Sequence, residues 1–335
     1  MSASTSAGFE LINPPVLSRS GVFRDEPLRT DTARQVAGWP SAQLVVVDDK
    51  GRTPVEWDAA PGAGFRVTDA GSWDVAEGSG ARLRTRPTTG DTPTDGSVLL
   101  GEREGVAYWA VRGGPDLVAG DDPSEWADLR MTGAVLDALG AGLFTTAVAV
   151  LNWHDMAQFC ARDGSPTHAA NAGWHRHCEA AGHEEYPRTD PAVICLVHDG
   201  ADQVLLARQP VWPEGRYSVL AGFVEAGESL EACVQREIHE EVGVVVSDVR
   251  YLGSQAWPFP RSLMLGFQAQ ADPTAPLMPA DGEIEEAMWV TRAELRAALG
   301  RGDWAGETQP VERPLLLPGR VSIARSMLDS WAALD

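Results

Sequence analysis

Three glutamates within the stretch Gly222–Val244 have a spacing that could assemble a metal site. Glu237, Glu240 and Glu241 stand at i, i+3 and i+4, so on a helix all three project from one side. Like charges at this spacing repel one another by roughly 0.2–0.5 kcal/mol per pair on an isolated helix. A hard divalent cation with oxygen ligands would turn this repulsion into attraction, so the spacing indicates metal binding.

The residues around these carboxylates favour the helix that is needed to position them. Ser229 is placed to cap the first turn and Gly243 to end the last one, which predicts a helix over 229–242. Arg236 lies four residues before Glu240 and eight after Glu228, where it can hold one carboxylate while others bind metal. An apolar stripe repeats every fourth residue and would anchor the helix on a core: Leu230, Val234 and Ile238.

The complete spacing of this stretch resembles the Nudix box of the Nudix hydrolases. The matching residues are, in order, Gly222, Glu228, Arg236, Glu237, Ile238, Glu240, Glu241, Gly243 and Val244. An ordinary solvated surface helix would not require this glycine or these fixed intervals. The resemblance implies a catalytic α/β/α sandwich that hydrolyses a diphosphate linked to another moiety.

The resemblance also implies roles for individual residues. Glu237 and Glu241 would ligate the catalytic Mg²⁺ or Mn²⁺, with Glu240 as a further ligand or as the base for water. The metal sites would be completed by the carbonyl of Ala221 and by Glu283, for which the nearby Glu285 and Glu286 could substitute. The expected catalytic set is Glu228, Arg236, Glu237, Glu240 and Glu241.

Composition limits the class of protein. A chain of 335 residues with 44% hydrophobic residues can form two domains with cores of their own. The net charge of −21 argues against a nucleic-acid-binding surface, which would need a basic stripe. Four cysteines are too few for a disulfide scaffold, and no signal peptide or membrane-spanning stretch is evident, so we expect a soluble cytoplasmic protein.

The pattern of strands and helices predicts an α/β protein in three parts. Residues 1–125 would form a smaller β-rich N-terminal domain, with residues 1–40 mostly loop. Residues 126–186 would form a connector: a helical linker, broken near Gly140–Gly142, and a degenerate zinc-ribbon-like segment. Residues 187–335 would form the catalytic Nudix sandwich.

The ribbon-like segment lacks half of the cysteines that a zinc ribbon needs. Such a ribbon reads C-x2-C twice, whereas here Cys160 is followed by Asp163 and Cys178 by an alanine at position 181. Cys160, Asp163, Cys178 and a histidine such as His183, His177 or His175 could still form a weaker site. We expect instead a turn that has lost its metal and is held by packing around Trp174.

A second segment bears on the choice of substrate. Ser254–Ser262, with the sequence SQAWPFPRS, sets Trp257 and Phe259 among prolines, which suits either a rigid platform for a flat base or a packed edge strand. It resembles the SQPWPFPxS signature of the NAD(H) pyrophosphatases, a branch of the Nudix family, and departs from it at Ala256. The resemblance to this branch covers about the last 175 residues and implies these substrate contacts: Tyr186, Phe223, Gln255, Ala256, Trp257, Pro258, Phe259, Pro260, Arg261, Ser262 and Ala324.

Together these features predict a metal-dependent hydrolase that splits NAD(H) into nicotinamide mononucleotide and AMP. The alternatives are removal of NAD caps from RNA 5′ ends by the same chemistry, hydrolysis of another nucleotide diphosphate such as ADP-ribose, or a nucleotide sensor without activity. The intact glutamate set argues against the sensor. Resemblance to the branch further implies a homodimer.

Overall fold

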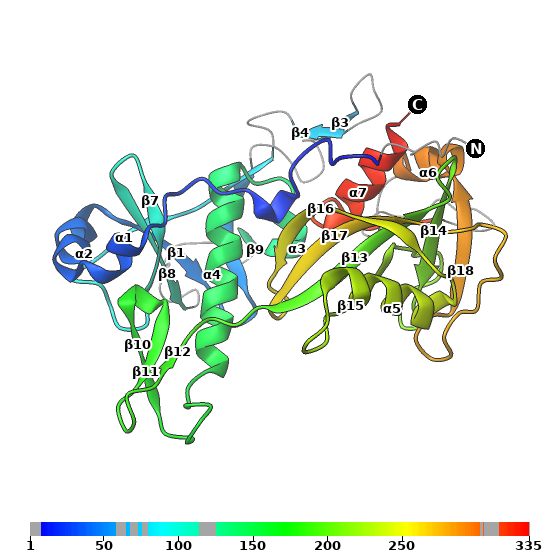
Figure 1. The fold of residues 1–335 in the computed structure, drawn as a ribbon. Helices are drawn as coiled ribbons and strands as arrows, with labels where there is room; N and C mark the ends of the chain where they lie inside the picture. The colour runs from blue at the N-terminus through cyan, green and yellow to red at the C-terminus, as the bar shows by residue number, and fades with distance from the viewer. Residues whose placement is uncertain are drawn as a thin grey trace.

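The computed structural model describes residues 8–57, 65–67, 73–75, 80–113, 125–301, 304 and 315–334. The molecule is elongated, with an N-terminal unit at one end and a catalytic unit at the other (Figure 1). The long helix α4 (Ala138–Met156) stands between them, and a small three-stranded ribbon lies beside its C-terminal half.

The catalytic unit is built on a mixed six-stranded sheet. Its strands are β13 (Asp190–His198), β14 (Gln203–Arg208), β15 (Leu220–Phe223), β16 (Ser247–Trp257), β17 (Ser262–Gln270) and β18 (Glu286–Thr291). The order is β16-β17-β13-β14-β18, with β15 also paired to β13, and β13 runs parallel to β17. This order makes β16, which ends with the first four residues of the SQAWPFPRS segment, an edge strand.

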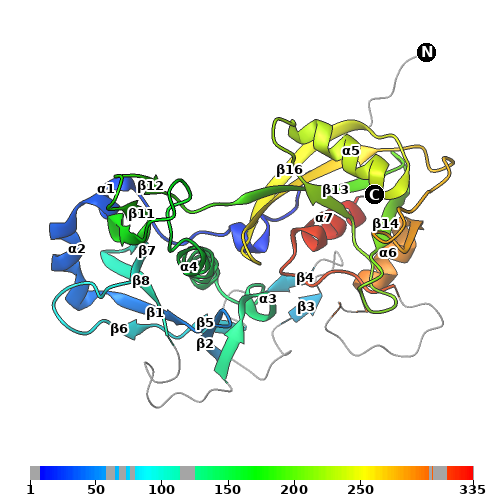
Figure 2. The same cartoon turned by 90° about the horizontal axis from the view of Figure 1, so that it is seen from below.

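Helices cover both faces of this sheet (Figure 2). Helix α5 (Leu230–Val242) buries one side against alternate β13 residues such as Val193 and Cys195. The intervening residues, such as Ile194, face α7 (Ile323–Ala332), which packs beside α6 (Arg292–Leu299). The predicted α/β/α sandwich is confirmed.

The N-terminal unit combines two sheets with α4. One sheet has the order β6-β1-β8-β7 and the other β5-β2-β9, and β3 pairs with β4. The strands are β1 (Gln43–Val47), β2 (Arg52–Trp57), β3 (Phe65–Val67), β4 (Trp73–Val75), β5 (Ala81–Leu83), β6 (Arg86–Pro87), β7 (Val98–Arg103), β8 (Val106–Arg112) and β9 (Trp126–Asp128). Short helix α3 (Leu129–Thr132) precedes α4.

Helix α4 differs from the expected broken linker. It is continuous through Gly140 and Gly142, and 11 of its residues are buried. Gly142 lies against the backbone of another segment, since an added Cβ would come 2.8 Å from the Arg19 carbonyl oxygen. Close packing therefore explains this glycine, and α4 belongs to the N-terminal core rather than to a connector that begins at residue 126.

Residues 8–40 contain more regular structure than the expected loop. They include η1 (Val16–Ser18), α1 (Glu26–Thr30), α2 (Thr32–Gly38) and η2 (Trp39–Ser41). The side chains of Asp25 and Asp31 cap α1 and α2. Residues before η1 pack on the catalytic unit, where Gln268 Nε2 donates to the Phe9 carbonyl at 2.8 Å. The N-terminal segment therefore spans both units.

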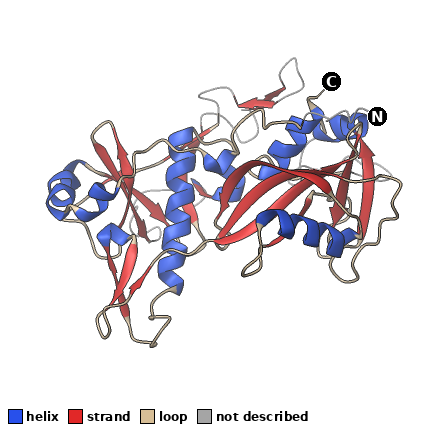
Figure 3. Cartoon of the chain, in the orientation of Figure 1, coloured by secondary structure: helices blue, strands red, loops and turns tan. Residues whose placement is uncertain are grey.

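The ribbon consists of β10 (Thr167–Ala170), η5 (Asn171–Gly173), β11 (His175–Cys178) and β12 (Glu184–Glu185), joined in a three-stranded sheet (Figure 3). It is tied to α4 because His154 Nε2 bonds the Gly173 carbonyl at 2.8 Å and Arg176 lies 3.0 Å from His154 Nδ1. Within the described residues, no helix has the length and apolar character needed to cross a bilayer.

Candidate active site

Helix α5 presents the glutamates as the sequence predicts. Ser229 Oγ accepts from the Ala232 N–H at 3.2 Å, and Gly243 ends the helix with φ +77°. The helix is anchored through the buried side chains of Val234 and Ile238. The cap, the end and the apolar stripe of this helix are therefore confirmed.

Arg236 organises three of the carboxylates. Its guanidinium donates to Glu228 at 2.8 and 2.9 Å, to Glu237 at 2.9 Å and to Glu240 at 2.9 Å. A further N–H reaches the Phe223 carbonyl at 3.0 Å, which ties the end of β15 to α5. Hydrogen bonding from Arg236 lowers the pKa of Glu228 to about 2, so Glu228 is the ionised partner that orients the arginine.

Glu241 lies outside this network, because the ion pairs of Arg236 join it to Glu228, Glu237 and Glu240. Glu241 is buried, and among the described residues its Oε2 has no hydrogen-bond partner. Burial, followed by repulsion from Glu237 and Glu283, raises the pKa of Glu241 to about 8, and hydrogen bonding to the Ala221 backbone offsets only part of this. A buried carboxylate that faces other carboxylates fits a divalent cation with oxygen ligands, so these residues suit Mg²⁺ or Mn²⁺.

The raised pKa of Glu241 predicts how stability depends on pH in the absence of divalent ions. Between its ordinary pKa near 4.5 and the folded value of about 8, the folded chain keeps a proton that the unfolded chain has released. Stability therefore falls as pH rises through this window. Glu241→Gln should remove this loss and raise stability at pH 8.5 by on the order of 1–3 kcal/mol, with little effect below pH ~4.5. Thermal melts of both proteins across pH, without divalent ions, test this; a difference that does not vary with pH would contradict it.

Gly222 allows β15 to approach the helix. A Cβ on Gly222 would lie 1.8 Å from Glu237 Cδ, so the glycine leaves the space that the Glu237 carboxylate occupies. Burial raises the pKa of Glu237, while Arg236 opposes the shift. Because Gly222 also pairs with Val193 in the sheet, this space has a fixed position relative to the strands.

The structure distinguishes the three glutamates after residue 282. Glu285 forms an ion pair with the buried Arg208, and Glu286 accepts from the Tyr217 hydroxyl at 2.6 Å. Glu283 is exposed and close enough to Glu241 to raise the pKa of that residue. Glu283 therefore faces the carboxylate cluster, whereas Glu285 and Glu286 are bound to Arg208 and Tyr217. No motif identifies Arg208 or Tyr217 in the sequence, because their partners lie 77 and 69 residues away.

The SQAWPFPRS segment is packed rather than open. Gln255 lies opposite Met264, which packs against the core on the α7 side, so Trp257 two residues later points to that same face. Trp257 and Phe259 contact each other edge to face at 4.9 Å and pack against the N-terminal core. The Arg130 guanidinium lies 3.7 Å from the centre of the Phe259 ring. Within one chain, this segment is therefore a packed edge strand, and its aromatic rings do not form an open platform for a base.

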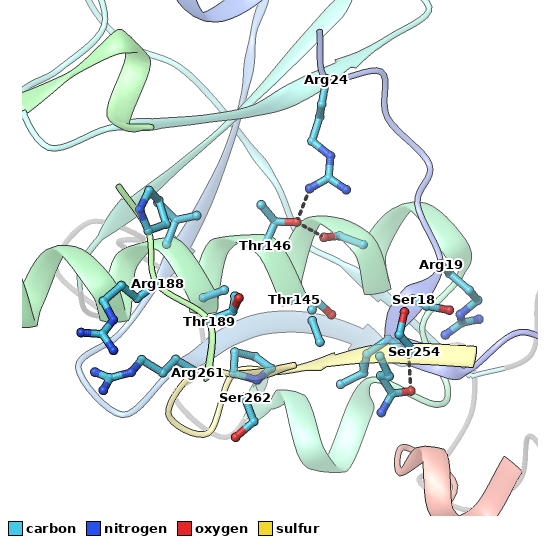
Figure 4. A pocket seen from close by; sticks show the side chains of 18 of the residues that line it. Ser18, Arg19, Arg24, Thr145, Thr146, Arg188, Thr189, Ser254, Arg261 and Ser262 are labelled. Carbon is cyan, nitrogen blue, oxygen red and sulfur yellow. Dashed lines mark hydrogen bonds between the residues drawn. The ribbon is translucent and has the colours of Figure 1, made fainter. Parts of the chain in front are cut away.

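The other expected substrate residues occupy different environments. Tyr186 and Phe223 are 58% and 60% exposed and can meet a ligand or a second chain. Gln255 and Ala324 are buried; the Gln255 amide bonds the Leu17 N–H and the Val321 carbonyl, which leaves it a structural role. Pro260 follows a cis peptide bond. Four more residues line a cavity beside α4 (Figure 4): Ala256, Pro258, Arg261 and Ser262.

The ribbon brings together the four suggested zinc ligands. Ligand atoms of Cys160, Asp163, Cys178 and His183 all lie within 4.8 Å of one another. The Cys160–His183, Asp163–His183 and Cys178–Asp163 separations are 3.3, 3.7 and 3.8 Å. Bond lengths of about 2.0–2.3 Å around tetrahedral zinc place ligand atoms roughly 3.3–3.8 Å apart, so the donor set fits zinc. Trp174, around which this turn was expected to pack, lies against the N-terminal core and donates to the Leu99 carbonyl at 2.7 Å.

Three consecutive segments match known domain families. Residues 41–153 match the NADH pyrophosphatase-like rudimentary NUDIX domain, residues 155–186 the NADH pyrophosphatase zinc ribbon domain, and residues 188–308 the NUDIX domain. The fold and the carboxylate site thus define a Nudix hydrolase.

Relatives extend this match to the whole chain. It is 49% identical over 337 residues to proteins named NAD-capped RNA hydrolase NudC from Mycobacterium tuberculosis H37Rv and Mycobacterium bovis BCG Pasteur, with 100% of each chain covered. NAD(P)H pyrophosphatase NUDT13 of Mus musculus is 43% identical over 61% of this chain and 58% of that protein. The chain therefore belongs to the NADH pyrophosphatase family of Nudix hydrolases, and the predicted resemblance is confirmed.

Proposed function

We propose that this protein hydrolyses the pyrophosphate bond of NAD(H) to nicotinamide mononucleotide and AMP. The observation that supports this most strongly is the cluster of Glu237, Glu240, Glu241 and Glu283, in which Oε2 of the buried Glu241 has no hydrogen-bond partner in the described part of the chain. The relatives named as NAD-capped RNA hydrolases and NAD(P)H pyrophosphatase share the NAD pyrophosphate as a substrate group.

Each residue of the cluster has a role in this proposal. Glu237, Glu241 and Glu283, with the Ala221 carbonyl, would hold Mg²⁺ or Mn²⁺, which supplies charge neutralisation and lowers the pKa of bound water. Glu240 is 55% exposed on its side chain and is oriented by Arg236, so it can accept the proton of the attacking water. Arg236 and Glu228 fix these positions. Phe223, exposed at the start of the box, would contact a base.

A second candidate substrate is RNA that carries an NAD cap at its 5′ end. The full-length similarity to proteins named for that activity favours it, whereas the net charge of −21 limits contact with the RNA backbone. Turnover of NADH, NAD-capped RNA and ADP-ribose at equal salt and Mg²⁺, with analysis for nicotinamide mononucleotide and AMP, separates these substrates. Failure to release nicotinamide mononucleotide from either NAD substrate would overturn the proposal.

We further propose that the ribbon holds one zinc ion through Cys160, Asp163, Cys178 and His183. His183→Ala should lose most of the zinc measured by elemental analysis and lower Tm by about 5 °C, because the metal crosslinks both turns of the ribbon. His168→Ala, in the exposed part of the same ribbon, is the control. A wild-type protein without zinc, or a His183→Ala protein with a full zinc content, would contradict this assignment.

We also propose a cytoplasmic homodimer. The exposed aromatic side chains of Tyr186 and Phe223 could be covered by a second copy of the chain. Light scattering on the purified protein measures the number of chains per particle, and a monomer at micromolar concentration would exclude this state.

A further inference from the structure

The loop between β17 and β18 carries Glu283 to the carboxylate cluster, and it is attached on both sides of that residue. On one side, the Ala280 N–H donates to the backbone carbonyl of Glu241 at 2.9 Å, near the end of α5. The N–H groups of Glu283 and Ile284 donate to the Ala280 carbonyl at 3.2 and 3.0 Å, which closes a tight turn. Glu283 therefore belongs to a turn that is bonded directly to the backbone of the buried glutamate.

On the other side, the loop is attached to β14 through Arg208. The Glu285 N–H donates to the Arg208 carbonyl at 2.9 Å, and the Glu285 carboxylate forms an ion pair with the Arg208 guanidinium. Between the two attachments, Ile284 is buried in the core cluster that anchors α5. Only Ile284 separates Glu283 from this ion pair, so the direction of the Glu283 side chain depends on where Glu285 is held.

Arg208 is suited to fix its partners because its charged group is enclosed. Its side chain is 9% exposed, whereas that of Glu285 is 51% exposed. A second bond fixes the guanidinium, which donates to the Trp212 carbonyl at 2.7 Å. Glu286 lies opposite Arg208 in the sheet but accepts from the Tyr217 hydroxyl, so Glu285 supplies the carboxylate. Burying a guanidinium group is costly unless it is paired, so breaking this ion pair should move the loop.

We propose that Arg208 is a positioning residue for the metal site, which holds Glu283 toward Glu241 through Glu285 and thereby sets the affinity for the divalent ion. Arg208 is not a metal ligand, because a guanidinium group has no acceptor atom. Groups that orient metal ligands commonly change metal affinity by about 10–100-fold when they are removed. This inference rests on the proposed metal site and adds to it a residue that lies outside the box, on β14.

The sign of the change in metal affinity separates positioning from a simple effect of charge. Arg208→Gln removes a positive charge, and Glu285→Gln removes a negative one. If charge alone mattered, the first change would strengthen the binding of a divalent cation and the second would weaken it. Positioning predicts that both changes weaken binding, because each breaks the same ion pair. For the same reason, the two losses should not add in the double variant.

Calorimetric titration of the dialysed full chain with Mn²⁺ alone measures this affinity. Arg208→Gln, Glu285→Gln and the double variant should each raise the Kd for Mn²⁺ by about tenfold. Glu285→Asp keeps the charge but shortens the side chain, and it should raise the Kd by about threefold; its exposed position keeps it informative if Arg208→Gln does not fold. Glu231→Gln, in the exposed first turn of α5, is the matched control and should leave the Kd unchanged.

Turnover of NADH gives a second readout. The Arg208 and Glu285 variants should need more Mg²⁺ for half-maximal rate, while kcat at saturating Mg²⁺ stays within about threefold of the wild type. A merely structural defect would instead lower kcat through the folded fraction and leave the Mg²⁺ requirement unchanged.

The outcomes for this inference and for the proposed hydrolysis are distinct. Weaker Mn²⁺ binding in both single variants supports the positioning role even if NADH proves not to be a substrate. Equal or tighter Mn²⁺ binding by a folded Arg208→Gln protein, or wild-type affinity in Glu285→Asp, would overturn this role even if the wild type hydrolyses NADH. A wild type that binds no Mn²⁺ up to about 10 mM would overturn it together with the proposed metal site.

Discussion

Glu241→Gln is expected to lower the turnover of NADH with Mg²⁺ by about 10²–10³-fold while leaving the protein folded. The carboxylate is buried with a free oxygen, and its neighbours Glu237 and Glu283 are also acidic, so the amide would remove charge that a cation needs. The amide has nearly the same shape, and burying an amide costs less free energy than burying an ionised carboxylate. Loss of activity should therefore accompany a stability that is unchanged or higher.

A matched control separates this effect from a general change in helix charge. Glu231 lies on the same helix but is exposed in its first turn, so Glu231→Gln should keep wild-type turnover. Steady-state kinetics across Mg²⁺ concentrations should show that excess metal restores the turnover of Glu241→Gln only in part. Wild-type turnover in this variant would exclude Glu241 as a metal ligand.

Local signals account for the parts of the site that the sequence predicts. Ser229, Gly243 and the carboxylate spacing act within one helix, where the residue types themselves determine the cap, the end and the shared face. The core strands are also recognisable, because β-branched and apolar runs such as Val193–Val197 are buried on both faces.

Contacts between distant segments explain what the sequence did not predict. The motif predicts that Gln255 contacts substrate, but its amide is hydrogen-bonded to the Leu17 N–H and the Val321 carbonyl. These partners lie 238 and 66 residues away in the sequence. The helix α4 was expected to break at its glycines, yet Gly142 is required by the neighbouring backbone of Arg19. A single sequence carries no local signal for such pairings.

Gly222 also lies at a close contact between segments. A methyl group added there should lower activity strongly and change stability little. Gly222→Ala is expected to reduce NADH turnover by about 10²-fold. The new Cβ would lie only 1.8 Å from Glu237 Cδ, so the Glu237 carboxylate would have to move. The carboxylate ends a flexible side chain and can rotate aside, so the cost appears in the site geometry and stability should change by less than about 1 kcal/mol.

Gly38→Ala is the control for Gly222→Ala, since Gly38 has φ −81° and no atom within 4 Å of an added Cβ. This change should alter neither turnover nor Tm. For Gly222→Ala, the kinetics should show a lower kcat, and metal titration should show a weaker response to Mg²⁺, because Arg236 and the displaced Glu237 no longer keep their separation of 2.9 Å. Full activity in Gly222→Ala would mean that Glu237 is not needed as a metal ligand. The proposed metal site would then have to be formed by Glu240, Glu241 and Glu283 without it.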